Sequence, residues 1–402
     1  MRITLLLTQS LEYPSGLGRY FPIAKELVRL GHEVNILALH PSFATVHPRS
    51  FTLRGVHISY VGQMHVRQVG DQRLYFRPPV LVWIAALSTL RLTLKALGAN
   101  TDLFHLGKPQ PINGMAALIA AKFLRRKPLY LDCDDYEAES NRVSGNWQKG
   151  VLALFENGLP RYTQGLTVNT RYLKERIVGL GYPPERIIRV PNGIDRARFT
   201  GLDPEYVSKL KSSLGLENHK VVAYLGSISL ASHPLQLLLQ AFEKVSERLS
   251  TARLILVGGG EDLETLRNMI PRIGLEGKAF LLGRVKPEIA PYYLAMGDVS
   301  VDPVMDDPVA RARSPLKIVE SMAVGVPVVT GDVGDRSEYL GNGLAGILVE
   351  PGDAEALADG LLGVLAHEDR AYAMAQATQE MRERYYWDVL IRDFCKIYDL
   401  EE

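Results

Sequence analysis

Short runs of β-branched residues and leucine alternate with helical patterns along nearly the whole chain. Such runs are typical of strands buried on both faces, and the helical stretches between them supply the crossovers that parallel strands require. A helix is expected from about residue 19 to 30, where Gly31 would end it. The alternation predicts an α/β protein with doubly wound parallel sheets. The expected strands are 2–7, 34–39, 56–61, 103–106, 129–132, 166–168, 187–190, 221–225, 253–257, 279–282, 299–301 and 326–329.

The chain has 402 residues, which is too long for one ordinary core and suits two domains. The boundary is expected at Pro191-Asn192-Gly193-Ile194-Asp195, where a strand runs into turn-forming residues. We therefore predict a Rossmann-like domain over 1–195, a second over 196–370, and C-terminal helices over 371–402. Tyr385, Tyr386 and Trp387 are expected to pack back on the first domain.

Composition excludes several classes of protein. Hydrophobic residues make up 47% and charged residues 23%, as in folded soluble proteins, and the net charge of +1 gives no overall basic field for nucleic acid. The only cysteines, Cys133 and Cys395, exclude a disulfide scaffold and fit a reducing cytoplasm.

The longest apolar stretch spans 80–97 and is interrupted by Arg91 and Lys95. It falls short of the roughly 20 apolar residues that cross a bilayer, so no transmembrane helix is expected. Basic residues surround its first part, which suits either a core helix with basic flanks or a helix that rests on the anionic inner face of a membrane. These basic residues are Arg67, Arg73, Arg77, Arg91 and Lys95.

The strongest local signal is Ser314-Pro315-Leu316-Lys317, followed by Glu320. Serine is a favoured N-cap and proline is favoured at the next position, so a helix is expected to begin here with unpaired N–H groups that suit an anion. Lys317 would add a cation, and Glu320 could accept hydrogen bonds from ribose hydroxyls. The alternative is a capped helix with an exposed Lys317–Glu320 pair.

Four segments occur in an order and spacing that resemble the retaining glycosyltransferases of GT-B fold, known as glycosyltransferase family four. The resemblance covers nearly the whole chain. Its segments are Val190-Pro191-Asn192-Gly193-Ile194-Asp195, Leu256-Val257-Gly258-Gly259-Gly260, Leu282-Gly283-Arg284-Val285, and Ser314 through Gly325-Val326-Pro327-Val328-Val329.

The resemblance implies two Rossmann-like domains facing a central cleft, with a nucleotide sugar such as a UDP- or GDP-hexose as co-substrate and no metal or other cofactor. A hexosyl unit would pass, with retention of configuration, to the hydroxyl of a carbohydrate, lipid-linked or small-molecule acceptor. Glu320 matches the glutamate that holds the donor ribose, and Gly283 and Arg284 match the strand end near the nucleobase. Ser15-Gly16-Leu17-Gly18-Arg19 resembles the family's glycine-rich loop.

The candidate residues follow from these matches. Catalytic candidates are His105, Lys317 and Glu320. Donor-binding candidates are Gly16, Gly226, Ser227, Gly283, Arg284, Val285, Arg313, Ser314, Pro315, Leu316, Lys317 and Glu320.

The chain also departs from the family pattern. Ala312 stands where the family often has a first glutamate, and Ser227 and Ser232 stand where it usually has an arginine and a lysine. Phosphate neutralisation would then fall to Lys317, Arg313, Arg284 or another group. Gly107 replaces the second of two histidines, which leaves His105 as either a sugar ligand or a structural residue.

Asp132-Cys133-Asp134-Asp135 permits three interpretations. Spaced aspartates can hold a divalent metal against a diphosphate, but the transferases that do so have a different fold, and no metal is expected here. Asp134 or Asp135 could instead contact an acceptor hydroxyl, or the segment could be a polar loop.

Three other functions are weighed against a transferase. A sugar-nucleotide epimerase can share this plan, and a binding or scaffolding protein could have kept the fold after losing activity, given the departures above. A nicotinamide-dependent oxidoreductase would need a dinucleotide fingerprint, which the chain lacks.

Overall fold

The computed structural model describes residues 1–12, 16–69, 72–141 and 145–399. Two compact units make up the chain. Unit 1 comprises Met1–Gly193, Ala312–Ser314 and Trp387–Glu402, and unit 2 comprises Ile194–Arg311 and Pro315–Tyr386. The change of unit after Gly193 falls inside the expected turn segment. The predicted C-terminal part, 371–402, is divided between the two units, because its residues up to Tyr386 belong to unit 2.

Unit 1 is built on an eight-stranded sheet in the order β10-β9-β8-β7-β1-β2-β4-β3. Every neighbouring pair is parallel except β3 and β4. All seven strands expected in this half are present, whereas β3 and the separate hairpin β5–β6 were not expected. The strands are β1 (Arg2–Leu7), β2 (Glu33–His40), β3 (Ser50–Leu53), β4 (Val56–Gln63), β5 (Val66–Val69), β6 (Gln72–Tyr75), β7 (Leu103–Gly107), β8 (Leu129–Cys133), β9 (Gly165–Val168) and β10 (Ile187–Arg189).

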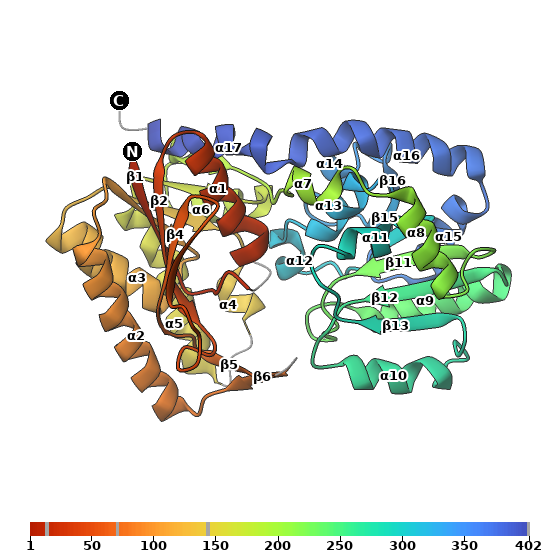
Figure 1. Ribbon diagram of the computed structural model, residues 1–402, viewed down its shortest axis with the longest axis horizontal. Coiled ribbons are helices and arrows are strands. Elements are labelled where there is room, and N and C mark those ends of the chain that lie inside the picture. The colour runs from red at the N-terminus through yellow and green to blue at the C-terminus, as the bar shows by residue number, and fades with distance from the viewer. Residues whose placement is uncertain (13–15, 70–71, 142–144, 400–402) are drawn as a thin grey trace. The chain divides into compact units, whose positions relative to one another are not determined.

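Alternate residues of β1 place unit 1's core on both faces of this sheet. Ile3, Leu5 and Leu7 pack with α1 (Phe21–Arg29) and α17 (Trp387–Cys395), whereas Leu6 packs with α2 (Pro78–Gly98) and α3 (Pro111–Ala117). Figure 1 shows α1 and α2 on opposite sides of β1, β2 and β4. The remaining helical segments are α4 (Glu137–Ser140), α5 (Asn146–Gly158), α6 (Arg171–Gly179), π-helices Gly16–Tyr20 and Leu118–Leu124, and 3-10 turns Leu159–Tyr162, Pro184–Arg186 and Lys396–Asp399.

The expected helix over 19–30 begins later than its pattern suggested. Arg19 and Tyr20 belong to the π-helix, and α1 proper begins at Phe21 and ends at Arg29. Gly31 follows with a positive φ of 90°, which fits its expected role in ending the helix.

Unit 2 is built on a six-stranded, wholly parallel sheet in the order β13-β12-β11-β14-β15-β16. The expected strand over 326–329 begins instead at Val328, because Pro327 has no N–H to donate to the ladder. β16 was not expected. The strands are β11 (Lys220–Leu225), β12 (Ala252–Val257), β13 (Ala279–Gly283), β14 (Val299–Asp302), β15 (Val328–Gly331) and β16 (Gly346–Val349).

Helices cover both faces of the unit 2 sheet. Val222 and Leu254 pack with α9 and α15, and their neighbours Val221 and Ile255 pack on the other face near α11. The helices are α7 (Arg196–Phe199), α8 (Pro204–Ser213), α9 (Leu235–Arg248), α10 (Leu263–Arg272), α11 (Ala290–Ala295), α12 (Pro308–Ala312), α13 (Leu316–Ala323), α14 (Arg336–Tyr339), α15 (Ala354–Leu365) and α16 (Glu368–Arg382), with a 3-10 turn at Glu383–Tyr385.

The aromatic cluster near the C-terminus is divided between the two units. Tyr385 stacks on Tyr339, with ring centroids 4.7 Å apart, and Tyr386 is buried in the same core of unit 2. Trp387 lies in the core of unit 1, where its indole N–H donates to the carbonyl of Gly18 at 3.0 Å. The expectation that all three pack on the first domain is therefore wrong for both tyrosines.

Candidate functional site

Strand order identifies one candidate region in each unit. In unit 2 the order reverses between β11 and β14, and in unit 1 it reverses between β7 and β1. Open parallel sheets bind ligands at the carboxyl ends of their strands, at such a point of reversal. Gly226 follows β11 in unit 2, whereas Thr8 and Lys108 follow β1 and β7 in unit 1.

Two glycines in unit 2 bring backbone segments unusually close together. Gly258 has a φ of 152°, and a Cβ at this position would lie 1.8 Å from the carbonyl oxygen of Gly226. A Cβ on Gly226 would in turn lie 2.6 Å from Cε of Lys317. Only glycine fits at position 258, and a side chain on Gly226 would displace Lys317, so bare backbone lies beside a cation at the strand ends.

The Lys317 ammonium lies among other charged and polar side chains. Its Nζ lies 3.4 Å from Oδ1 of Asp302 and 3.2 Å from Nδ1 of His233, and Arg336 Nε donates to the other carboxylate oxygen of Asp302 at 3.0 Å. Burial raises the pKa of Asp302, but the charges of Arg336 and Lys317 outweigh it and lower that pKa to about 2. Two cations thus meet at one carboxylate, and a group of this kind suits an anionic ligand.

Helix α13 begins at Leu316 with Pro315 as its N-cap residue, and the expected cap at Ser314 is wrong. The Ser314 hydroxyl accepts a hydrogen bond from the backbone N–H of Asn192 at 2.8 Å, and the Asn192 amide donates to the Ser314 carbonyl at 3.0 Å. The N-cap residue of α13 makes no side-chain hydrogen bond, and the N–H of Ile318 donates to the Pro315 carbonyl at 3.2 Å. A helix start of this kind can offer its remaining N–H groups to an anion. Ala312 is fully buried in unit 1's core.

Glu320 is not the exposed partner of Lys317 that the alternative interpretation required. The Lys317 side chain is 15% exposed and pairs with Asp302. Within the described part of the chain, the Glu320 side chain makes no hydrogen bond, and burial raises its pKa against the opposing charges of Arg198 and Lys317. A half-buried carboxylate without hydrogen-bond donors suits the hydroxyls of a bound sugar.

The other donor candidates lie at neighbouring strand ends. Gly283 closes β13 with a φ of 71° and accepts a hydrogen bond from the N–H of Gly258 at 2.8 Å. Arg284 is exposed beside it and Val285 is half-buried. Ser227 is exposed, and its carbonyl accepts from the Tyr224 hydroxyl at 3.0 Å. Arg313, beside Ser314, is half-buried.

In unit 1, Gly16 lies in the π-helix after β1, where a Cβ would lie 2.2 Å from the Ser10 carbonyl oxygen. This close approach explains the glycine there. Ser15, the first residue of the predicted loop, lies outside the described residues.

His105 is a core residue, and its geometry argues against the predicted role as a sugar ligand. It is fully buried on β7, its ring packs on Phe394 at 5.0 Å, and its Nδ1 forms a hydrogen bond with the Tyr398 hydroxyl at 3.0 Å. Burial lowers its pKa to about 4, so the ring is neutral. A histidine could not replace Gly107 either, because a Cβ there would lie 2.4 Å from a Leu7 methyl carbon.

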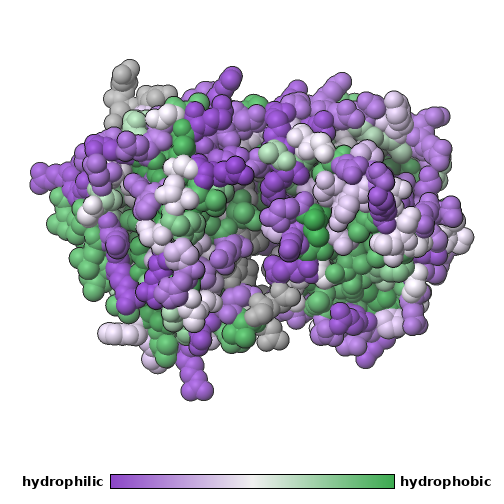
Figure 2. Space-filling model, in the orientation of Figure 1, coloured by the Kyte–Doolittle hydropathy of each residue, from purple (hydrophilic) through white to green (hydrophobic). Residues whose placement is uncertain are grey.

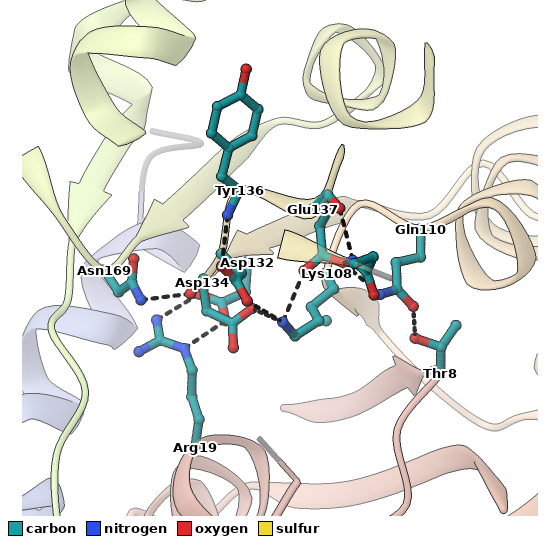
Figure 3. A network of polar contacts seen from close by, with 12 residues as sticks. Thr8, Arg19, Lys108, Gln110, Asp132, Asp134, Tyr136, Glu137 and Asn169 are labelled. Carbon is teal, nitrogen blue, oxygen red and sulfur yellow. Dashed lines mark hydrogen bonds and ion pairs between the residues drawn. The ribbon is translucent and has the colours of Figure 1, made fainter. Parts of the chain in front are cut away.

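The polar cluster in Figure 3, centred on Lys108, was not predicted. Lys108 has a positive φ of 66° and a buried side chain. Its Nζ lies 2.8 Å from Glu137, 3.1 Å from Asp134 and 3.7 Å from Asp135. Gln110 Nε2 donates to Glu137 at 2.5 Å. The signal in the sequence was the lysine directly after a strand at the reversal point.

Asp132 is occupied by structural contacts. Arg19 donates two hydrogen bonds to its carboxylate, both at 2.7 Å, and the Thr167 hydroxyl donates a third at 2.5 Å. Arg19 also donates to the carbonyl of Val190 at 3.1 Å and to the Asn192 side chain at 3.0 Å. These contacts tie β8 to the residues after β10 and leave Asp132 little capacity for a metal ion. Among the described residues, no group of three or more His, Cys, Asp or Glu side chains could hold a metal ion.

Asp134 differs sharply from Asp132. Its side chain is only 6% exposed, yet Oδ1 has the ion pair with Lys108 and no hydrogen bond in the described part of the chain. Burial raises the pKa of Asp134 to about 6, although the charge of Lys108 opposes this shift. Asp135 is more open, with 24% of its side chain exposed.

Comparisons with known proteins agree with this architecture. Residues 16–198 match the family model described as Glycosyltransferase Family 4, and residues 219–367 match the model described as Glycosyl transferases group 1. An uncharacterized glycosyltransferase of Methanocaldococcus jannaschii is 25% identical over 389 residues, which are 94% of this chain and 92% of that protein. The GDP-mannose-dependent alpha-(1-6)-phosphatidylinositol monomannoside mannosyltransferase of Mycobacterium tuberculosis is 28% identical over 240 residues, covering 58% of this chain and 62% of that protein.

A solved structure supports the same fold. HepE of Anabaena, crystallised with UDP-glucose, superposes with a TM-score of 0.75 and 20% identity, covering 99% of both chains. The two doubly wound units therefore form a GT-B fold, and the chain belongs to the group 1 glycosyltransferases of family four.

Proposed function

We propose that this glycosyltransferase moves a hexosyl unit from a nucleoside diphosphate sugar to an acceptor hydroxyl, with retention of configuration and without a metal ion. The observation that carries the proposal is the position of the Lys317 cation at Gly226, where Gly258 brings a second backbone segment close. The carboxylate of Glu320, which makes no hydrogen bond within the described residues, lies one helical turn further along α13. The mannosyltransferase relative, whose name specifies GDP-mannose, and the structural neighbour solved with UDP-glucose support this class of donor.

In the reaction, the bond from the anomeric carbon to the diphosphate breaks and a bond to the acceptor oxygen forms on the same face. The acceptor proton passes to the leaving diphosphate. Lys317 and the first N–H groups of α13 would stabilise the charge that grows on the diphosphate, which is the work a divalent metal does in other transferases. Glu320 would hold the ribose hydroxyls.

We also propose that unit 1 rests on an anionic membrane surface. α2 has 21 residues and contains an 18-residue window with a mean hydropathy of 1.6, so it is long and apolar enough to cross a bilayer by length and composition, contrary to the sequence prediction. Leu92 and Ala96 are nevertheless buried in the core of unit 1, where α2 packs on β4 and α3. A helix held in this layer suits a surface position better than a span.

The outer face of α2 has the composition expected of a helix at a membrane surface. Trp83, Leu90 and Leu94 are each more than half exposed, and Arg91 and Lys95 are exposed beside them. Figure 2 shows hydrophobic residues gathered over the side of unit 1 that α2 and α3 form. Arg67 and Arg77 are exposed too, whereas the side chain of Arg73 lies outside the described part. Apolar groups flanked by cations suit anionic lipid, and a lipid-linked acceptor would lie within that surface.

The test is consumption of nucleotide sugars by the purified chain. A panel that includes UDP-glucose and GDP-mannose is screened for thermal stabilisation, and the best binder is then assayed for turnover with and without EDTA. We expect one nucleotide sugar to be consumed at the same rate in EDTA, and NMR of the glycosidic product to show the donor's anomeric configuration. No binding by any member of the panel would refute the proposed donor class.

A further inference from the structure

Within the described part of the chain, the carboxyl end of β8 in unit 1 brings together more carboxylates than cations. Arg19 pairs with Asp132 at 2.7 Å, and Lys108 lies nearest to Glu137, at 2.8 Å. Each cation thereby has one closest carboxylate. Asp134, labelled in Figure 3, and Asp135 have the longer contacts with Lys108, at 3.1 and 3.7 Å. Among the described residues of this cluster, these two carboxylates therefore have no cation of their own.

Three buried polar groups around this strand end have no hydrogen-bond partner among the described residues. They are Oδ1 of Asp134, Oδ1 of Asn169, whose amide donates to the Asp134 carbonyl at 2.7 Å, and the hydroxyl of Tyr20, a residue that is 1% exposed. Tyr20 Cζ would lie 2.9 Å from a Cβ on Gly107, directly before Lys108. The ring of Tyr20 therefore packs against the end of β7, where Gly107 pairs with Asp132 of β8. Burial, and then the charges of Asp134 and Asp132, raise the pKa of Tyr20. Folded proteins rarely leave such groups unbonded unless a ligand or water completes them.

The chemistry of these groups selects the kind of ligand that would complete them. Carboxylates accept hydrogen bonds and the tyrosine hydroxyl can donate one, so adjacent hydroxyls of a polyol would match both. A phosphate group would instead meet Asp134 and Asp135, while Lys108 is already committed to Glu137. Like charges at such distances are strongly unfavourable where water is scarce.

We propose that Asp134, Asp135 and Tyr20 form a binding site for an uncharged, hydroxyl-rich part of the acceptor, and that this site rejects a phosphorylated one. The inference rests on the proposed transferase function and names the acceptor class that the function leaves open. Asp134 receives the hydrogen of an acceptor hydroxyl as a hydrogen bond and thereby positions the oxygen that attacks. The proton itself leaves with the diphosphate, as in the proposed reaction.

The experiment compares matched acceptors on the full chain with the donor identified above. Each pair consists of a neutral polyol and its monophosphate: glucose and glucose 6-phosphate, inositol and inositol 3-phosphate, glycerol and glycerol 3-phosphate. The readout is kcat/KM for the acceptor at saturating donor. Wild type is measured beside an Asp134→Asn/Asp135→Asn double variant and beside Glu139→Gln, which removes an exposed carboxylate of α4 outside the cluster.

We expect the wild type to favour the neutral member of any pair it uses by at least tenfold. In the double variant, kcat/KM for neutral acceptors should fall, mainly because the acceptor KM rises. The ratio of kcat/KM between the neutral and the phosphorylated member of a pair should then be close to one. Glu139→Gln should keep both the rate and the ratio of the wild type. A preference for the phosphorylated member, or an unchanged ratio in the double variant, would overturn the proposal.

If none of these six acceptor compounds receives the sugar, the same six are tested as inhibitors of donor hydrolysis by water. Inhibition by the neutral members that the double variant abolishes supports the site. Inhibition only by the phosphorylated members, or no inhibition at 100 mM, contradicts it. Donor hydrolysis also distinguishes the two proposals. If the chain neither binds nor hydrolyses any nucleotide sugar, the proposed transferase function is wrong. If it uses a donor but prefers phosphorylated acceptors, only the proposed acceptor site is wrong.

Discussion

Replacing Asp134 by asparagine should stabilise the protein while it impairs transfer. Burial raises the pKa of this carboxyl from 3.8 to about 6 in the folded chain. A raised carboxyl pKa means that the folded state holds the proton more tightly than the unfolded chain does, so folding stability falls as pH rises from below 3.8 through about 6. Asparagine has nearly the shape of the protonated acid and no charge, so the variant avoids that loss.

The size of the effect follows from the shift of about 2.2 pH units. At about 1.36 kcal/mol per unit, ionised Asp134 costs the folded state up to about 3 kcal/mol above pH 7. Part of that cost arises between pH 5 and pH 8, because the pKa of about 6 lies in that interval. Because a buried amide also needs hydrogen bonds, we expect a net gain of about 1–3 kcal/mol at pH 8 and a smaller gain at pH 5.

The measurement is urea unfolding followed by tryptophan fluorescence at both pH values. All three tryptophans, Trp83, Trp147 and Trp387, belong to unit 1, so the signal reports the unit that contains Asp134. Glu139→Gln is the control, and its stability should change by less than about 0.5 kcal/mol. The opposite view makes Asp134 an essential counter-ion of Lys108, in which case the variant should lose about 3–5 kcal/mol. A loss of stability at pH 8 would refute our reasoning.

Three further predictions concern the donor site and the membrane. Lys317→Ala should lower kcat by at least about 100-fold with a smaller change in donor KM, because charge on the diphosphate grows toward the transition state; equal kcat values would remove Lys317 from catalysis. Gly258→Ala should weaken calorimetric binding of the nucleoside diphosphate by more than about tenfold, because its Cβ would meet the Gly226 carbonyl, and full affinity would show that the close approach is unimportant. Wild type should co-sediment with anionic but not neutral liposomes at low salt, and Leu90→Glu/Leu94→Glu should not; retained binding by the variant would exclude the α2 surface.

The strands that could be predicted are those that the packing buries on both faces. β1, β11 and β12 are long apolar runs, and such runs are typical of strands that a parallel sheet buries on both faces. β3 and the hairpin β5–β6 escaped prediction because they lie outside the parallel core and contain mostly polar or exposed residues. β16 was missed because its four residues are too few to show a pattern.

Candidate residues that a local pattern marks could be predicted, whereas those that depend on contacts distant in sequence could not. Gly226, Lys317 and Glu320 lie close in sequence to strand ends and to a helix start, so local patterns were enough to mark them. The Lys108 cluster depends on contacts with Glu137 and Asp134, 29 and 26 positions away, and on a positive φ that no local pattern encodes. His105 was misjudged for the converse reason, because Tyr398, which covers it, comes from the far end of the chain.

Calorimetric titration with the nucleoside diphosphate of the donor identified by the panel tests the central claim most directly. Wild type is compared with Glu320→Gln and with Glu264→Gln, which alters an exposed carboxylate on α10. If Glu320 holds the ribose, its variant should lose about 1.5–3 kcal/mol of binding free energy, and Glu264→Gln should bind as wild type does. Wild-type affinity in folded Glu320→Gln of unchanged melting temperature would contradict the donor site described here.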